Sequence, residues 1–253
     1  MNIFVCTSRG AALQPFLAKK IKSPFKIYNY PGATLRTITF NTKQILANLD
    51  SASPCTFYII AGLPDITKRI KNYYLGYEEV IFEGEPYKVS QKILRDIHHL
   101  ADIIHLNNHK VVICPIVPSN IEKWNLCRLR QHHTHFLSYR NSYPDMQMKI
   151  HSTTLLINNE IVNFNAENSV TTPFIATLVI VTYKRNPSAI ACNKFQYKHL
   201  PDGVHFNPTI ANRIVNKIVK SIKSNSEYIV PSPKRKSEEE LDGPSSPKRS
   251  WRS

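Results

Sequence analysis

Three side chains that lie far apart in the chain have the types that nucleophilic catalysis uses. Ser8 follows the apolar run NIFVC, and Asp202 and His205 stand three residues apart in LPDGVHFNP. A serine hydroxyl becomes a nucleophile when a histidine accepts its proton and a carboxylate orients the imidazole. One loop can set the geometry between Asp202 and His205, whereas only the fold can bring Ser8 to them. A structural interpretation stays open, in which Asp202 caps a turn, His205 lies on the surface and Ser8 caps a helix.

The elements that would position these residues follow a regular order. The expected strands are NIFVCT, FKIYNY, TFYIIA, KVVICPIV and ATLVIVTY, and the expected helices cover residues 12–21, 35–49, 89–108, 153–165 and 207–223. Short β-branched or aromatic runs that alternate with segments of helical period are typical of α/β proteins. The pattern predicts a three-layer α/β/α sandwich with a mainly parallel five-stranded sheet. Ser8 then lies at the carboxyl edge of the sheet, where open α/β folds bind ligands.

Two segments interrupt the alternation, and each follows an expected strand. Residues 66–86 are rich in Tyr, Lys and Glu, and residues 119–152 contain Trp124 and several basic side chains. We expect both insertions at the carboxyl edge of the sheet, as lids or specificity loops. The second insertion also contains Cys127, His132, His133 and His135. The paired ligand spacing of a zinc site is absent, so we predict a polar, basic loop and no metal.

Glycines follow the second and third expected strands, in YPGATL and IIAGLPDIT. Gly32 and Gly62 are therefore expected at the same edge as Ser8. A glycine there lets the backbone turn tightly or come close to a ligand, and turn formation is the commoner reason. The first N–H groups of the helix after Ser8 could stabilise an oxyanion.

Four short segments, in this order, resemble the motifs of the SGNH hydrolases, also called GDSL-type esterases and lipases: Cys6-Thr7-Ser8, Pro31-Gly32-Ala33, Gly62-Leu63-Pro64-Asp65 and Asp202-Gly203-Val204-His205. The resemblance covers residue 2 to about 224 and implies a flavodoxin-like fold without a cofactor. It implies that His205, oriented by Asp202, is the general base for Ser8, which forms an acyl-enzyme with an ester substrate. It also implies that the backbone at Ser8, Gly32 and Gly62 binds the oxyanion or the substrate.

The third segment departs from the family at the residue that should complete the oxyanion hole. Pro64 stands where the family has an asparagine, and proline has neither a side-chain donor nor a backbone N–H. Loss of one such donor typically costs about 10²–10³ in rate. Two interpretations follow: an esterase for acetyl or short acyl esters with a weakened oxyanion hole, or an inactive SGNH-like fold that binds nucleic acid or protein. Similar folds with basic tails occur in some retroelements and viruses, which suggests a mobile-element or viral origin.

Positive charge dominates the composition. The chain has 33 Lys and Arg against 18 Asp and Glu, and residues 1–224 contain 27 of the bases and 13 of the acids. A field of this size favours polyanionic partners such as nucleic acid, although a solvated basic surface is the alternative. The last expected helix carries an outer face of four cations: Arg213, Lys217, Lys220 and Lys223.

The two ends of the chain and its cysteines indicate where in the cell the protein is located. Residues 225–253 are rich in Ser, Pro and charge, so we expect a disordered tail after a domain that spans residues 1–224. Its basic clusters, Lys234-Arg235-Lys236 and Lys248-Arg249, resemble a bipartite nuclear signal for the import machinery. The five scattered cysteines indicate a reduced, intracellular protein. No run of eighteen apolar residues occurs and the N-terminus does not look like a secretory signal, so we expect no contact with a membrane.

Overall fold

The centre of the molecule is a parallel β-sheet whose strands follow the order β2-β1-β3-β6. The computed structural model describes residues 1–49, 53–72, 77–131, 143–183, 192–195 and 197–227. The four strands are β1 (Asn2–Cys6), β2 (Phe25–Asn29), β3 (Thr56–Ile60) and β6 (Lys110–Ile113). β1 lies in the middle and pairs with β2 and β3 over its whole length. Its carboxyl end, and with it Ser8, therefore has a strand end on each side.

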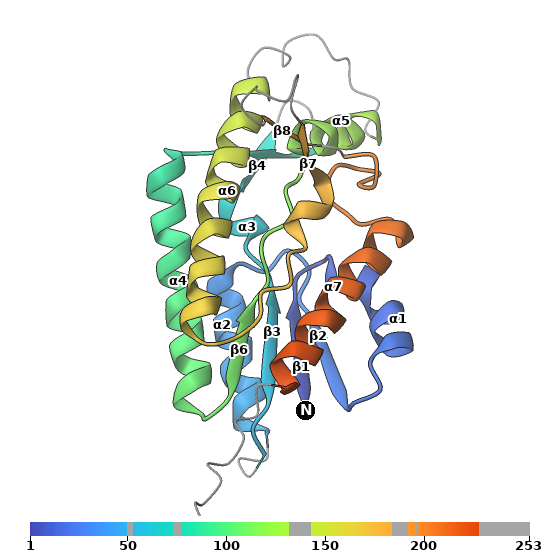
Figure 1. Cartoon of the computed structure of the whole chain (residues 1–253). Coiled ribbons are helices and arrows are strands. Elements are labelled where there is room, and N and C mark those ends of the chain that lie inside the picture. The colour runs from blue at the N-terminus through green and yellow to red at the C-terminus, as the bar shows by residue number, and fades with distance from the viewer. Residues whose placement is uncertain (50–52, 73–76, 132–142, 184–191, 196, 228–253) are drawn as a thin grey trace, which may run out of the picture.

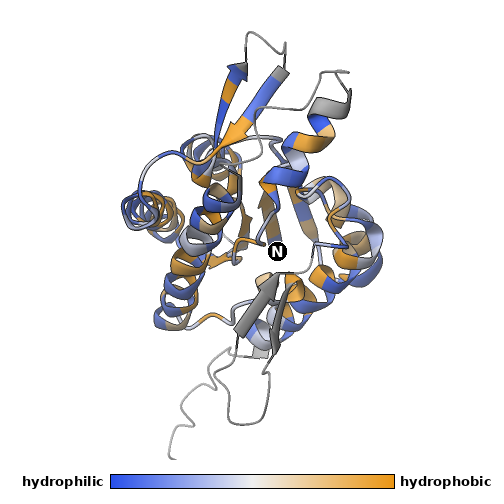
Figure 2. Cartoon of the chain, turned by 90° about the horizontal axis from the view of Figure 1, so that it is seen from above, coloured by the Kyte–Doolittle hydropathy of each residue, from blue (hydrophilic) through white to orange (hydrophobic). Residues whose placement is uncertain are grey.

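Helices cover both faces of this sheet (Figure 1). One face carries α1 (Gly10–Lys20) and α7 (Pro208–Glu227), and the other carries α2 (Leu35–Ala47), α4 (Pro86–Leu106) and α6 (Tyr143–Glu167). Alternate residues of each strand point to opposite faces, so Val5 and Phe4 belong to two separate hydrophobic clusters. Orange, hydrophobic residues of the sheet strands lie between the helical layers in Figure 2; β1 and β3 are buried on both faces, whereas the edge strand β2 is partly exposed.

Local sequence explains where α7 begins and which side it buries. The Asn207 side chain accepts a hydrogen bond from the N–H of Ile210 at 3.0 Å, as an N-cap does. Ile210, Ile214 and Ile218 recur at helical spacing and are completely buried against the sheet. The start of α7 is therefore fixed only two residues after His205.

The two insertions fold into separate elements that contact each other. The first follows α3 (Leu63–Ile66) and contains the antiparallel strands β4 (Lys68–Asn72) and β5 (Tyr77–Ile81); the second contains α5 (Ile121–Gln131) and the first turns of α6. The Asn125 side chain of α5 accepts a hydrogen bond from the Val80 N–H at 3.0 Å and donates one to the Val80 carbonyl at 2.7 Å. We call the β4–β5 pair together with α5 the roof, since Figure 1 shows it beyond the carboxyl ends of the sheet strands.

The predicted α/β architecture with a parallel sheet between helices is confirmed, but the predicted fifth strand of the sheet is wrong. The run ATLVIVTY divides into a 3₁₀ helix (Ala176–Val179) and β7 (Ile180–Tyr183). β7 pairs antiparallel with β8 (Cys192–Phe195), and in the described part of the chain the parallel sheet has four strands. β-Branched residues favour an extended backbone, but they do not select its partner strand.

Three further predictions concern one helix, the segments rich in His or basic residues, and membrane spans. The helix expected over residues 153–165 begins earlier, at Tyr143. The prediction missed its first turns because they are too polar to show an apolar stripe. The His132, His133 and His135 cluster and the basic clusters of the tail lie outside the described residues, so the nuclear signal stays a prediction. In the described ranges, no helix is long and apolar enough to cross a membrane.

Candidate active site

A cavity of about 560 Å³ opens at the carboxyl end of the sheet, beneath the roof. Ser8 and His205 both line it, together with Gly32 from the loop after β2. The fold thus brings to one place residues that are almost two hundred positions apart in the chain. Asp202 and Gly62 do not line the cavity; each supports a residue or segment that does.

Asp202 and His205 are joined by a short hydrogen bond within their own loop. The Asp202 Oδ2 atom lies 2.6 Å from His205 Nδ1, and Oδ1 accepts the N–H groups of Val204 and His205 at 2.9 and 2.7 Å. Burial by itself raises the pKa of Asp202, but the hydrogen bonds from His205 and Val204 bring that pKa below its usual value. Asp202 is therefore a carboxylate at neutral pH. With Nδ1 as the donor to Asp202, the other imidazole nitrogen is free to accept a proton.

Gly203 allows this loop to close. Its φ of +88° lies in the left-handed region, and a Cβ there would come 2.1 Å from the Asn120 carbonyl oxygen. The Gly203 carbonyl in turn accepts the Asn120 N–H at 2.8 Å, and Lys123 Nζ donates to the Leu200 carbonyl at 2.9 Å. The loop that carries His205 is thus fastened to the start of α5, whose Trp124 ring stands edge-on 5.4 Å from the imidazole.

Ser8 lies in the turn between β1 and α1 and is half-buried. Its hydroxyl and its backbone N–H make no hydrogen bond within the described part of the chain, including none to His205. Hydrogen bonds of catalytic groups are often long in unliganded sites and shorten only when the substrate is bound. Both donors of Ser8 are therefore available to a ligand in the cavity.

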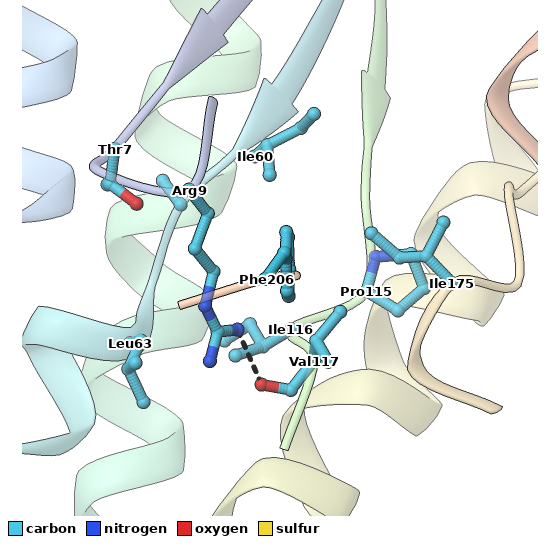
Figure 3. A pocket seen from close by; sticks show the side chains of 10 residues that line it. Thr7, Arg9, Ile60, Leu63, Pro115, Ile116, Val117, Ile175 and Phe206 are labelled. Atoms are coloured by element: carbon cyan, nitrogen blue, oxygen red, sulfur yellow. Dashed lines mark hydrogen bonds between the residues drawn. The ribbon is translucent and has the colours of Figure 1, made fainter. Parts of the chain in front are cut away.

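Arg9, directly after Ser8, is buried and connects three segments of the site. Its Nε donates to the Val204 carbonyl at 3.1 Å, Nη1 donates to the Val117 carbonyl at 2.7 Å, and Nη2 donates to Ser119 Oγ. Figure 3 shows this side chain running between apolar residues to the Val117 carbonyl, and the guanidinium lies 4.9 Å from the centre of the Phe206 ring. Burial lowers the pKa of Arg9 to about 9, which leaves it charged at neutral pH. The sequence analysis missed this role, since a basic residue in a turn is ordinarily exposed.

The two predicted glycines have different surroundings. Gly32 lines the cavity with a φ of +71°, whereas Gly62 is buried with a φ of +108°. A Cβ on Gly62 would come 2.5 Å from Ile116 Cδ1, so any other residue would have to displace that side chain and adopt a strained backbone. The Gly62 carbonyl accepts the N–H of Asp65 at 3.1 Å, which forms the turn that places Pro64 in the cavity wall. The structure therefore gives Gly62 a part in shaping the site.

Asp65 connects this turn to the loop that contains Gly32. Both of its carboxylate oxygens lie 3.0 Å from the Leu35 N–H, at the first turn of α2. Burial raises the pKa of Asp65 to about 6, although the hydrogen bond from Leu35 opposes this shift. The sequence analysis used Asp65 only as part of a motif.

The cavity is lined by cations and by no described acidic residue. Lys68, Arg69 and Arg128 come from the roof. Lys68 pairs with Glu83 at 2.7 Å, and the Arg128 guanidinium lies 4.8 Å from the centre of the Trp124 ring. This lining stabilises negative charge in the cavity. Nowhere in the described ranges do three or more His, Cys, Asp or Glu side chains form a group that could hold a metal ion.

The predicted cations of α7 lie away from this cavity. Arg213, Lys220 and Lys223 are exposed and Lys217 is partly exposed. They occupy the side of α7 opposite to the buried isoleucines, as predicted, and do not line the cavity. Any partner that they bind would therefore approach a different surface from an ester substrate.

Comparison with known proteins shows a likeness in structure but not in sequence. No protein-family model matches the chain, and neither does any curated protein sequence. A candidate acylhydrolase from Bacteroides fragilis is 15% identical with a TM-score of 0.55, over 88% of this chain and 86% of that one. A GDSL-like lipase from Bacteroides thetaiotaomicron is 14% identical with a TM-score of 0.53, over 89% and 88% of the two chains.

An acetyl xylan esterase is 11% identical with a TM-score of 0.51, over 88% of this chain and all of its own (100%). The matched proteins are lipases, esterases or acylhydrolases, and each match spans most of both chains. This agreement confirms the fold that the four sequence motifs predicted. The chain has the fold of the SGNH hydrolases and diverges from the matched proteins in sequence.

Proposed function

We propose that the protein is a serine esterase that hydrolyses acetyl or short acyl esters. The observation that carries this proposal is the 2.6 Å hydrogen bond between Asp202 and His205, at a cavity that Ser8 also lines. A histidine oriented by a carboxylate beside a serine with a free hydroxyl is the arrangement that activates a nucleophile. The likeness in fold to an acetyl xylan esterase supports the choice of ester chemistry.

In the acylation step, His205 accepts the hydroxyl proton of Ser8 while Ser8 Oγ attacks the ester carbonyl carbon. The carbonyl oxygen becomes an oxyanion, which the N–H groups of Ser8 and Gly32 stabilise. The intermediate collapses, the ester C–O bond breaks, and His205 returns the proton to the departing alcohol. Asp202 stabilises the imidazolium throughout and keeps its own charge.

In the deacylation step, His205 accepts a proton from water, and the hydroxide oxygen attacks the carbonyl carbon of acyl-Ser8. The second tetrahedral intermediate expels Ser8 Oγ, which regains its proton from His205, and a carboxylic acid leaves. The cavity of about 560 Å³ has the size of a small-molecule site, so it accommodates a short acyl group together with part of the alcohol.

The test is hydrolysis of p-nitrophenyl acetate by the full chain and by Ser8→Ala. We expect turnover in the wild type and loss to background in the variant. Ser226→Ala is the matched control, because Ser226 is exposed on α7 and its hydroxyl contacts only a helical carbonyl. Labelling with a fluorophosphonate, followed by mass spectrometry, should place the adduct on Ser8. Equal rates in wild type and Ser8→Ala would refute the proposal.

A second candidate function is binding of nucleic acid through α7. Its basis is the exposed position of Arg213, Lys220 and Lys223 together with the charge of residues 1–224. Phosphates bound by several Lys and Arg residues release counterions, so the affinity should fall steeply with salt. This function does not compete with the esterase, since the two surfaces are separate.

Labelled single-stranded RNA tests this candidate. Replacing Arg213, Lys220 and Lys223 by Gln should weaken binding and reduce its salt dependence by about three counterions. The control carries the same charge change on another exposed helix face, at Lys88, Lys92 and Arg95 of α4. Equal losses in both triple variants would show attraction by overall charge and contradict a site on α7.

A further inference from the structure

The proposed esterase lacks a hydrogen-bond donor at Pro64, where SGNH hydrolases have an asparagine. Pro64 lines the cavity and can donate no hydrogen bond through side chain or backbone. The oxyanion would then be held by the N–H groups of Ser8 and Gly32 alone. A group that compensates for the missing donor must reach the oxyanion from another element of the chain.

One cation of the roof lies close to Gly32. The Nη2 atom of Arg69, on β4, lies 3.5 Å from the position that a Cβ would take on Gly32, and its Cζ lies 4.0 Å from that point. No other side chain of the described residues comes within 4 Å of that position. Arg69 therefore stands over the loop that supplies one of the two remaining oxyanion donors.

Among the described residues, the guanidinium of Arg69 is held only by a long ion pair. Its Nη1 lies 3.8 Å from Glu78 Oε2, which is longer than a hydrogen bond, and it donates none within the described part of the chain. Its side chain is 60% exposed, so it can turn toward a ligand. Lys68, its neighbour on β4, is instead held by Glu83 at 2.7 Å.

We propose that Arg69 is the oxyanion donor that replaces the missing asparagine, which makes it a further catalytic residue of the esterase. An N–H of its guanidinium donates to the carbonyl oxygen of the substrate when that oxygen becomes negative. Such a charge-assisted hydrogen bond is stronger in the transition state than in the neutral ester, so it accelerates the reaction. This assignment rests on the proposed esterase function.

The first test compares Arg69→Met with Lys71→Met on p-nitrophenyl acetate, which has no charge. Removing one oxyanion donor lowers kcat by about 10²–10³, and we expect about 10² here because Arg69 is exposed. KM should change little. Lys71→Met removes the same charge from an exposed position of the same strand outside the cavity, and it should keep kcat within about threefold. Thermal unfolding of both variants checks that they are folded.

The second test restores a donor at the original place. Pro64→Asn should raise kcat at least about tenfold in the Arg69→Met background and less in the wild type, because one donor substitutes for the other. A merely structural role of Arg69 would not produce this rescue. Added guanidinium ion should also recover part of the activity of Arg69→Ala.

The outcomes separate the two proposals. Turnover that depends on Ser8 but not on Arg69 would overturn the donor role and leave the esterase intact. A loss seen only as a higher KM for an anionic ester, such as p-nitrophenyl hemisuccinate, would overturn it too, since Arg69 would then bind substrate charge. A wild type without turnover that depends on Ser8 would contradict both.

Discussion

Replacing Arg9 tests whether its hydrogen bonds hold the site together. Arg9→Met keeps an apolar stem but leaves the carbonyls of Val204 and Val117 without their donor in a buried place. A buried acceptor that loses its donor costs about 1–3 kcal/mol. The Val117 carbonyl keeps a long hydrogen bond of 3.4 Å from Ser119 Oγ, so the two carbonyls together predict a loss of about 3 kcal/mol. Burial disfavours the charge of Arg9, so its removal offsets part of this loss, whereas losing the attraction between Arg9 and Asp202 adds to it. A domain of this size has a total stability of about 5–15 kcal/mol, so the variant should be severely weakened.

Urea unfolding followed by tryptophan fluorescence measures this loss. Arg9→Lys keeps the charge and one hydrogen bond and should lose about 2 kcal/mol, which provides a folded variant if Arg9→Met does not fold. Arg95→Met, at an exposed position of α4, should stay within about 0.5 kcal/mol of the wild type. A loss below about 1 kcal/mol in Arg9→Met would refute this reasoning.

Two further predictions concern Asp65 and the His205 loop. Because burial raises the pKa of Asp65 from 3.8 to about 6, the folded protein binds more protons than the unfolded chain between these values, and its free energy of unfolding falls as the pH rises through them. Urea unfolding should therefore show Asp65→Asn equal to the wild type near pH 4 and about 2 kcal/mol more stable at pH 7; equal stability at both would contradict this. Gly203→Ala should cost more than about 2 kcal/mol and lower kcat, because its Cβ meets the Asn120 carbonyl at 2.1 Å. Gly84→Ala shares a positive φ (+98°) but has its nearest contact at 3.4 Å, so it should lose only about 1–2 kcal/mol, and equal losses in the two would argue against the clash.

Sequence reasoning succeeded where the information is local. Asp202 and His205 are three residues apart, so their hydrogen bond depends on one short loop whose Asp-Gly pair is visible in the sequence. The buried strands were predicted because both faces of a parallel sheet are apolar, and β1 and β3 read as continuous hydrophobic runs.

Sequence reasoning failed where a segment far along the chain decides how a residue or strand is placed. Whether the run ATLVIVTY joins the sheet depends on what covers the edge of β6, which no local pattern encodes. Arg9 was missed because its burial comes from acceptors more than a hundred residues away. For Arg69 a signal did exist: KRIKN faces YEEVI across β4 and β5, and the opposite charges of two neighbouring runs indicate a hairpin.

The pairing of Asn125 with both backbone groups of Val80 has a consequence for how such proteins can be altered. One amide side chain acts at this point like an adjoining strand, since it satisfies an edge that would otherwise be open. Transferring β4 and β5 without α5 into another protein of this fold would expose that edge and misplace Arg69. The two insertions are distant in sequence but must be exchanged together, while Ser8, Asp202 and His205 stay on the loops at the carboxyl end of the sheet beneath them. The roof side of the cavity and the residues of the proposed triad thereby lie on parts of the chain that can be redesigned one at a time.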